Sequence, residues 1–177
     1  ALLHVDPGPV TTTRLLLRPL ELSDAPRMAA FMRAPEIARM SSSMPNPQPE
    51  IGVEGFILIT QARAQLKREH VFGVHLAGEG FIGMANAHVG ALAHVGALAP
   101  VGAQVPGAGH ATGPQIALAK REVEIGYWIG KPYWGEGYGT EFAIAIADYA
   151  AALGQGPVTA NHFADNPVSG RVLEKAA

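Results

Sequence analysis

The feature that most constrains the fold is a glycine-rich loop that joins a strand pattern to a helix pattern. Hydrophobic patterning predicts a strand over 122–129 and an alanine-rich helix over 140–153, and between them Gly135, Gly137 and Gly139 occupy alternate positions. Glycine lets a backbone curl until successive N–H groups converge. The helix that follows adds free N–H groups and the positive end of its dipole. Such a loop can bind a phosphate group with main-chain atoms alone.

The glycine spacing by itself does not identify a nucleotide-binding motif. The loop lacks the Lys-Ser/Thr pair of a P-loop, and its alternate glycines do not give the dinucleotide spacing G-x-G-x-x-G. A plain turn between strand and helix is therefore an equal alternative. An ATP-binding module is disfavoured, because no lysine in the loop would neutralise the phosphates.

The remaining patterns predict one mixed α/β domain. Strands are expected over 13–20, 71–76, 81–87, 122–129 and 157–163, with a hairpin turn over 77–80. Helices are expected over 24–33, 50–68, 140–153 and from Asn166 to the end, where Asn166 is the N-cap and Pro167 the first helical residue. Residues 41–49, with three prolines, are expected to form a loop.

Much of the glycine and proline lies in one unusual segment. The 177 residues include 21 glycines and 14 prolines, and the 40 residues from Gly80 to Ala119 contain no Asp, Glu, Lys or Arg. Residues 88–93 are repeated directly as 94–99. So few copies cannot stack a β-helix core. We therefore predict a single domain over 1–177 with a low-complexity insertion at about 87–119, and we interpret His88, His94 and His110 as exposed loop residues.

Composition excludes several functions. The net charge of −2 argues against an electrostatic nucleic-acid binder, and the absence of cysteine excludes disulfides, thiolate metal sites and a cysteine nucleophile. The first residues do not form a signal peptide, and no apolar run is long enough to span a membrane. The sequence therefore predicts a cytoplasmic protein with no metal, nucleic-acid or membrane partner.

Four segments, taken in order, carry a family resemblance. They are residues 12–25, residues 81–83 after a strand, residues 124–128 leading into 134–141, and residues 166–175. Together they resemble the Gcn5-related N-acetyltransferases (GNAT), and within them the ribosomal-protein-alanine acetyltransferases. The resemblance implies the GNAT fold, an α/β (α+β) domain with a mixed, mostly antiparallel central sheet flanked by helices. The family's C-terminal β-hairpin has no counterpart after Lys175.

The resemblance also implies acetyl-CoA as co-substrate. In the family, main-chain N–H groups of the glycine loop hold the pyrophosphate, and the edge of the preceding strand pairs with the pantetheine arm. A helix-capping asparagine contacts the pantetheine region. Carried onto this chain, the cofactor-binding residues are Tyr127, Trp128, Ile129, Trp134, Gly135, Glu136, Gly137, Tyr138, Gly139, Thr140 and Asn166.

The implied reaction is direct acetyl transfer to an amine in a ternary complex, which suits a chain without a cysteine nucleophile. Ser169 is the expected hydrogen-bond donor to the leaving sulfur, and Glu124 the first candidate for the general base. Glu122, His75 and His162 are further candidates for the base. Some family members have a glutamate and a tyrosine where this chain has Asn161 and Leu173, so that acid–base pair is missing.

The acceptor is expected to be a primary amine, on a protein N-terminus or on a small molecule. The alternative is a non-catalytic member of the same fold that binds CoA or a protein partner. A homodimer is left open.

Overall fold

The structure, a computed structural model, describes residues 8–39, 49–64, 69–89, 122–153, 156–162 and 166–176. Three predicted regions lie outside the described residues. They are residues 41–48 of the loop predicted over 41–49, the end of the helix predicted to reach residue 68, and the repeat region beyond Val89, with His94 and His110.

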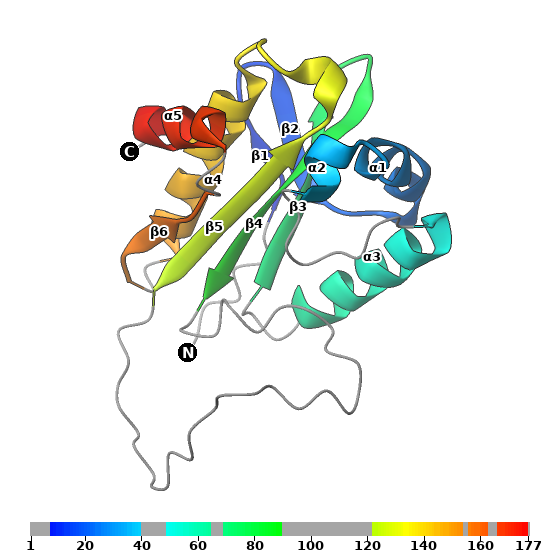
Figure 1. Cartoon of the computed structure of the whole chain (residues 1–177). Coiled ribbons are helices and arrows are strands. Elements are labelled where there is room, and N and C mark those ends of the chain that lie inside the picture. The colour runs from blue at the N-terminus through cyan, green and yellow to red at the C-terminus, as the bar shows by residue number, and fades with distance from the viewer. Residues whose placement is uncertain are drawn as a thin grey trace, which may run out of the picture.

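The described strands form one mixed sheet, as predicted (Figure 1). In spatial order, which is also chain order, they are β1 (Val10–Thr11), β2 (Leu15–Pro19), β3 (Glu69–Leu76), β4 (Gly80–Val89), β5 (Val123–Ile129) and β6 (Val158–Ala160). Each neighbouring pair is antiparallel except β5 and β6, which are parallel. The mostly antiparallel sheet inferred from the sequence is confirmed.

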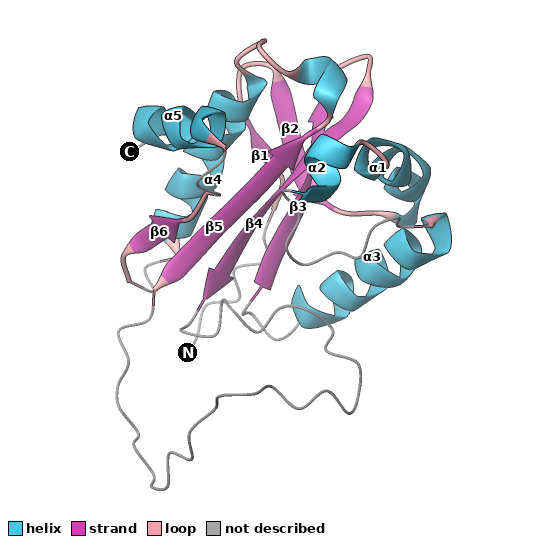
Figure 2. Ribbon diagram, viewed as in Figure 1, coloured by secondary structure: helices cyan, strands magenta, loops and turns pink. Residues whose placement is uncertain are grey.

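Helices cover both faces of this sheet, as Figure 2 shows. The α-helices are α1 (Ala25–Met32), α2 (Pro35–Arg39), α3 (Glu50–Ala64), α4 (Tyr138–Ala152) and α5 (Pro167–Ala176), and two short 3₁₀ turns are η1 (Leu22–Asp24) and η2 (Lys131–Tyr133). Helix α4 begins at Tyr138, two residues before the predicted start, because Gly137 already serves as its N-cap. The short elements β1 and α2 were not predicted.

The two faces of the sheet bury separate hydrophobic clusters. Helix α4 packs on one face, over a cluster that includes Leu17, Phe72, Val74, Ile82, Phe142 and Ile146. Helices α1 and α3 pack on the other, over Leu20, Met28, Met32, Val53, Ile57, Phe81 and Met84. Side chains of β5 alternate between the two faces, as the period of a strand requires: Ile125 and Tyr127 lie toward α4, and Trp128 toward α1 and α3.

Strand β4 continues to Val89, so the first residues of the predicted insertion are strand. His88 therefore lies in the sheet, where its Nε2 is 3.0 Å from Asn86 Nδ2, and our interpretation of it as a loop histidine was wrong.

The close approach of β4 to β5 makes Gly83 necessary. A Cβ at this position would lie 2.5 Å from the main-chain oxygen of Trp128 and 3.0 Å from the Cα of Ile129. Since backbone atoms cannot move aside cheaply, Gly83→Ala should lower the free energy of unfolding by about 2 kcal/mol. Gly55→Ala, inside α3 with nothing within 4 Å of the new Cβ, should instead raise it by about 0.5 kcal/mol. Urea denaturation of both variants checks the pair, and equal effects would contradict this packing.

Candidate active site

The parallel strands β5 and β6 share only part of their length. Their pairing covers Val123 to Ile125 on β5 and Val158 to Ala160 on β6. Strand β5 continues to Ile129, and no strand in the described ranges pairs with its last four residues on that side. Beyond the end of β6, one edge of β5 is therefore open.

The ladder on the other side of β5 shows which main-chain groups face this edge. The N–H of Gly130 donates to the carbonyl oxygen of Ile82 at 2.8 Å, so even-numbered residues direct their main-chain groups toward β4. The main-chain groups of Tyr127 and Ile129 consequently face the open edge. The indole Nε1 of Trp134 donates to the Ile129 carbonyl at 2.8 Å and ties the loop to the strand end. The N–H and C=O of Tyr127 and the N–H of Ile129 face the open edge, where an extended ligand could pair with them.

The glycine loop follows directly and leads into α4. Gly135 and Gly137 have φ values of 84° and 80°, in the left-handed region that glycine adopts without strain. The first intrahelical bond runs from Glu141 N to Gly137 O, so the N–H groups of residues 138–140 have no partner within the helix. Gly137, the N-cap, supplies no capping side chain. These free N–H groups and the positive end of the helix dipole suit a phosphate group.

The three glycines of the loop are not equivalent. Only Gly135 and Gly137 need their positive φ. Gly139 is helical, and a Cβ there would lie 3.9 Å from Val172 of α5. Because 3.9 Å is an ordinary contact distance, neither the backbone conformation nor the packing against α5 requires glycine at position 139.

Ser169 lies at the first turn of α5, on the α4 side of the open edge. Its N–H donates to Asn166 Oδ1 at 3.2 Å, which makes Asn166 the N-cap that the sequence predicted. The Tyr127 hydroxyl donates to the main-chain oxygen of Ser169 at 3.2 Å and lies 3.1 Å from Ser169 Oγ. The Tyr127 ring packs edge-on against Phe142. Burial raises the pKa of Tyr127, and the hydrogen bond with Ser169 offsets part of that rise.

The sequence predicts only a main-chain role for Tyr127. The hydroxyl pairing with Ser169 could not be read from spacing, since 42 residues separate the partners.

Glu124 lies on the opposite face of β5 from Ser169, so the structure does not bring the two expected catalytic residues together. Its Oε1 accepts a hydrogen bond of 2.8 Å from Asn161 Nδ2, and its register partner on β4 is His88. Asn161, which stands where some family members have a glutamate, thus binds the carboxylate of Glu124.

Among the described residues, two buried polar atoms without a hydrogen-bond partner lie on this same face of the sheet. They are Nε1 of Trp128 and Oδ1 of Asn86. Asn86 pairs in register with Gly126, and its Oδ1 lies 2.6 Å from where a Cβ of Gly126 would be. Together with Glu124, they form a polar strip across β4 and β5 on the α1/α3 face of the sheet.

The other candidate bases lie elsewhere. His75 is on β3, two strands from β5, where its Nε2 is 2.9 Å from Asp24 Oδ1 and its Nδ1 is 3.1 Å from the Gly73 carbonyl. His162 lies against α5, with its Nε2 3.1 Å from the position of a Cβ on Gly170. Glu122 is exposed just before β5.

Among the residues that the structure describes, no three His, Asp or Glu side chains are placed to hold a metal ion. No described helix has the length and apolar character needed to cross a membrane.

Known proteins share this fold. The profile of the acetyltransferase (GNAT) domain matches residues 14–177. Among solved structures, RimL, a ribosomal L7/L12 alpha-N-protein acetyltransferase in complex with coenzyme A, is 16% identical with a TM-score of 0.67, covering 96% of this chain and 82% of its own. RimJ of Mycobacterium smegmatis in complex with CoA-disulfide is 20% identical, TM-score 0.65, covering 94% and 72%. AAC(6')-Ib in complex with ribostamycin and coenzyme A is 17% identical, TM-score 0.65, covering 93% and 82%.

Proposed function

The chain belongs to the GNAT acetyltransferase family, and from this membership we propose that it transfers the acetyl group of acetyl-CoA directly to a primary amine. The observation that carries the proposal is that, within the described part of the chain, two sets of main-chain groups without hydrogen-bond partners lie next to each other. The open edge of β5 runs into the glycine loop and the free N–H groups of residues 138–140. In CoA, an extended arm that contains amide groups is joined to a pyrophosphate. The arm can pair with the open edge of β5, and the pyrophosphate can bind the N–H groups of the loop and helix.

Different residues would hold the different parts of acetyl-CoA. The N–H and C=O of Tyr127 and the N–H of Ile129 suit the pantetheine arm, while the main-chain groups of Trp128 belong to the ladder with β4. The loop from Trp134 to Thr140 suits the pyrophosphate. Acetyl-CoA would supply the activated acetyl thioester, and a neutral amine that attacks its carbonyl carbon would release CoA as a thiolate.

Ser169 is our proposed hydrogen-bond donor to the departing sulfur. Its position at the first turn of α5, held by Asn166 and by the Tyr127 hydroxyl, supports this role. Tyr127 is a positioning residue here, because it acts through Ser169. A donor aimed at the charge that develops on the leaving group stabilises the transition state.

Glu124 is our proposed general base, acting from the other face of β5. A free α-amine has a pKa near 8 and must lose a proton before it attacks. The polar strip of Glu124, Asn86 and Trp128 supports entry of the acceptor from the α1/α3 face. The donor and the base would then approach the thioester from opposite faces of the strand.

The acceptor class is part of the proposal. The name of RimL describes it as an alpha-N-protein acetyltransferase. The structure of AAC(6')-Ib contains the small molecule ribostamycin. This fold therefore serves both protein and small-molecule acceptors. We propose a primary amine of one of these two classes. The cytoplasmic location and an insertion beyond the end of β4 at Val89 remain predictions from the sequence, and a homodimer is still left open.

Acetyl-CoA binding and turnover test the proposal. Calorimetry should show binding, and a panel of N-terminal peptides and small amines should yield an acetylated product by mass spectrometry. Ser169→Ala should lower kcat about a hundredfold with little change in the KM for acetyl-CoA. Ser23→Ala, an exposed serine on η1, is the matched control and should keep full activity. Binding without turnover would favour the non-catalytic alternative, and no binding at millimolar acetyl-CoA would contradict the proposal.

A further inference from the structure

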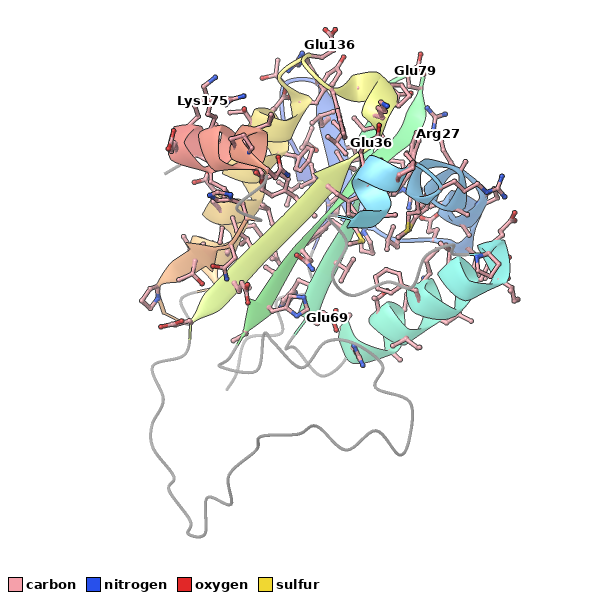
Figure 3. The ribbon with its side chains drawn as sticks, viewed as in Figure 1. Arg27, Glu36, Glu69, Glu79, Glu136 and Lys175 are labelled. Carbon is pink, nitrogen blue, oxygen red and sulfur yellow. The ribbon has the colours of Figure 1, made fainter. Side chains whose placement is uncertain are left out.

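The turn between β1 and β2 reaches across to the glycine loop through a single side chain. Arg14 Nη1 donates to the main-chain oxygen of Glu136 at 3.1 Å, and Arg14 Nε donates to Glu141 Oε2 at 2.7 Å. The guanidinium carbon lies 4.3 Å from the centre of the Tyr138 ring. One arginine thus binds the loop, the N-terminal residue of α4 and a carboxylate in its first turn. Figure 3 shows Glu136 at the outer end of the molecule, where this loop lies.

The carboxylate of Glu141 is held from several directions. It also accepts hydrogen bonds from the main-chain N–H of Arg14 at 2.8 Å and from Thr12 Oγ1 at 2.6 Å. Burial alone would raise the pKa of Glu141, but the hydrogen bonds from Thr12 and Arg14 outweigh burial and lower it. Glu141 is therefore ionised at neutral pH. A bare carboxylate in the first turn of α4 would repel a phosphate bound at the same helix end.

Arg14 supplies the positive charge that offsets the ionised carboxylate of Glu141. Residues 134–141 contain two glutamates and no lysine or arginine. Lys131, just before the loop, pairs with Glu36. The Nη2 of Arg14 also lies only 3.6 Å from where a Cβ of Gly137 would be, directly beside the N-cap of α4.

The bond to Glu136 has a second consequence. A trans peptide unit is planar, so its C=O and the following N–H point in opposite directions. Arg14 holds the main-chain oxygen of Glu136 toward the side of the loop on which the guanidinium lies. The N–H of Gly137 is therefore directed toward the opposite side of the loop. We infer that Arg14 is a positioning residue for pyrophosphate recognition, which orients the Gly137 N–H and neutralises Glu141. This inference rests on the proposed function.

Two ligands separate pyrophosphate recognition from general binding. CoA contains the pyrophosphate and S-acetyl-pantetheine lacks it. Arg14→Ala should raise the Kd for CoA at least tenfold by calorimetry, and should change the Kd for S-acetyl-pantetheine less than twofold by ligand-observed NMR. Arg14→Lys should also bind CoA more weakly than the wild type, because a single ammonium cannot bridge the Glu136 oxygen and the Glu141 carboxylate as the guanidinium fork does.

The control is Arg63→Ala, which removes an arginine of similar exposure that pairs with Glu69 at 3.4 Å. It should bind CoA within twofold of the wild type. Adding Glu141→Gln to Arg14→Ala should recover part of the lost CoA affinity, since the uncompensated anion is then removed. Circular dichroism checks that each variant is folded, and Arg14→Gln replaces Arg14→Ala if the latter is not.

Unchanged CoA affinity in the folded Arg14 variants, or equal losses for both ligands, would overturn the role of Arg14. Failure of the wild-type protein to bind either ligand would instead contradict the acetyl-CoA proposal on which this inference rests.

Discussion

Gly137→Val should weaken CoA binding on the order of a hundredfold while leaving the protein folded. Gly137 is the N-cap of α4 with φ of 80°. A β-branched residue in this left-handed conformation costs about 1–2 kcal/mol or more. The loop would relieve that strain by rotating its peptide units, and N–H groups would turn away from the phosphate. Losing one or two hydrogen bonds to a charged group costs about 1.5–3 kcal/mol each, which corresponds to roughly 10- to 100-fold or more in affinity.

The chain offers a control with the same backbone conformation. Gly78, in the turn between β3 and β4, also has φ of 80°, and a Cβ there meets nothing within 4 Å. Gly78→Val carries the same local strain at a site remote from the glycine loop. It should lower the melting temperature about as much as Gly137→Val but leave the Kd for CoA unchanged. Calorimetry with CoA measures the difference. Similar CoA affinities for the two variants would show that the loop conformation does not matter for binding.

The parts of this fold that could be predicted are those in which neighbouring residues in the sequence form the element. The strand, glycine loop and helix from 122 to 153 lie next to one another in sequence, and each has its own pattern. The hairpin of β3 and β4 is equally local, with Gly78 and Gly80 at positive φ. By contrast, β1 and α2 have only two and five residues, too few to show a period.

The contacts that organise the candidate site are not local. Arg14 and Glu141 are 127 residues apart, Tyr127 and Ser169 are 42 apart, and Glu124 and Asn161 are 37 apart. Spacing in the sequence carries no information about such pairs, because only the sheet topology brings them together. A family resemblance could therefore indicate Ser169 and Glu124, but it could not indicate that they lie on opposite faces of β5.

The second large effect is on stability and centres on Asp24, whose side chain is 5% exposed. Its carboxylate accepts two hydrogen bonds from the Arg18 guanidinium, at 3.0 and 3.1 Å, and one from the N–H of Glu21 at 3.0 Å. His75 Nε2 is 2.9 Å from Oδ1. This cluster joins β2, η1 and β3. Removing one partner of a buried ion pair costs about 3–5 kcal/mol, because the other charge is left uncompensated. Asp24→Asn should therefore lower the free energy of unfolding by about 3 kcal/mol at pH 7.

The pH dependence of that loss follows from the direction of the pKa shift. Burial alone would raise the pKa of Asp24, but hydrogen bonds from His75, Glu21 and Arg18 outweigh it and lower the pKa below its usual value. A carboxyl group whose pKa is lower in the folded state stabilises the fold above its unfolded pKa, which is near 3.9. That stabilisation is lost as the pH falls through the lower, folded pKa.

The free energies of unfolding of wild type and Asp24→Asn should therefore differ most at neutral pH and converge as the pH falls below about 4. Asp148→Asn, which changes an exposed aspartate on α4, should stay within about 0.5 kcal/mol of wild type across the range. Urea denaturation at a series of pH values measures both variants. A difference for Asp24→Asn that is small at pH 7, or that does not narrow in acid, would mean that the fold does not depend on the ionised Asp24. The contact of strands β2 and β3 with helices α1 and α3 would then depend on other interactions, among them the apolar packing around Leu20 and Phe81.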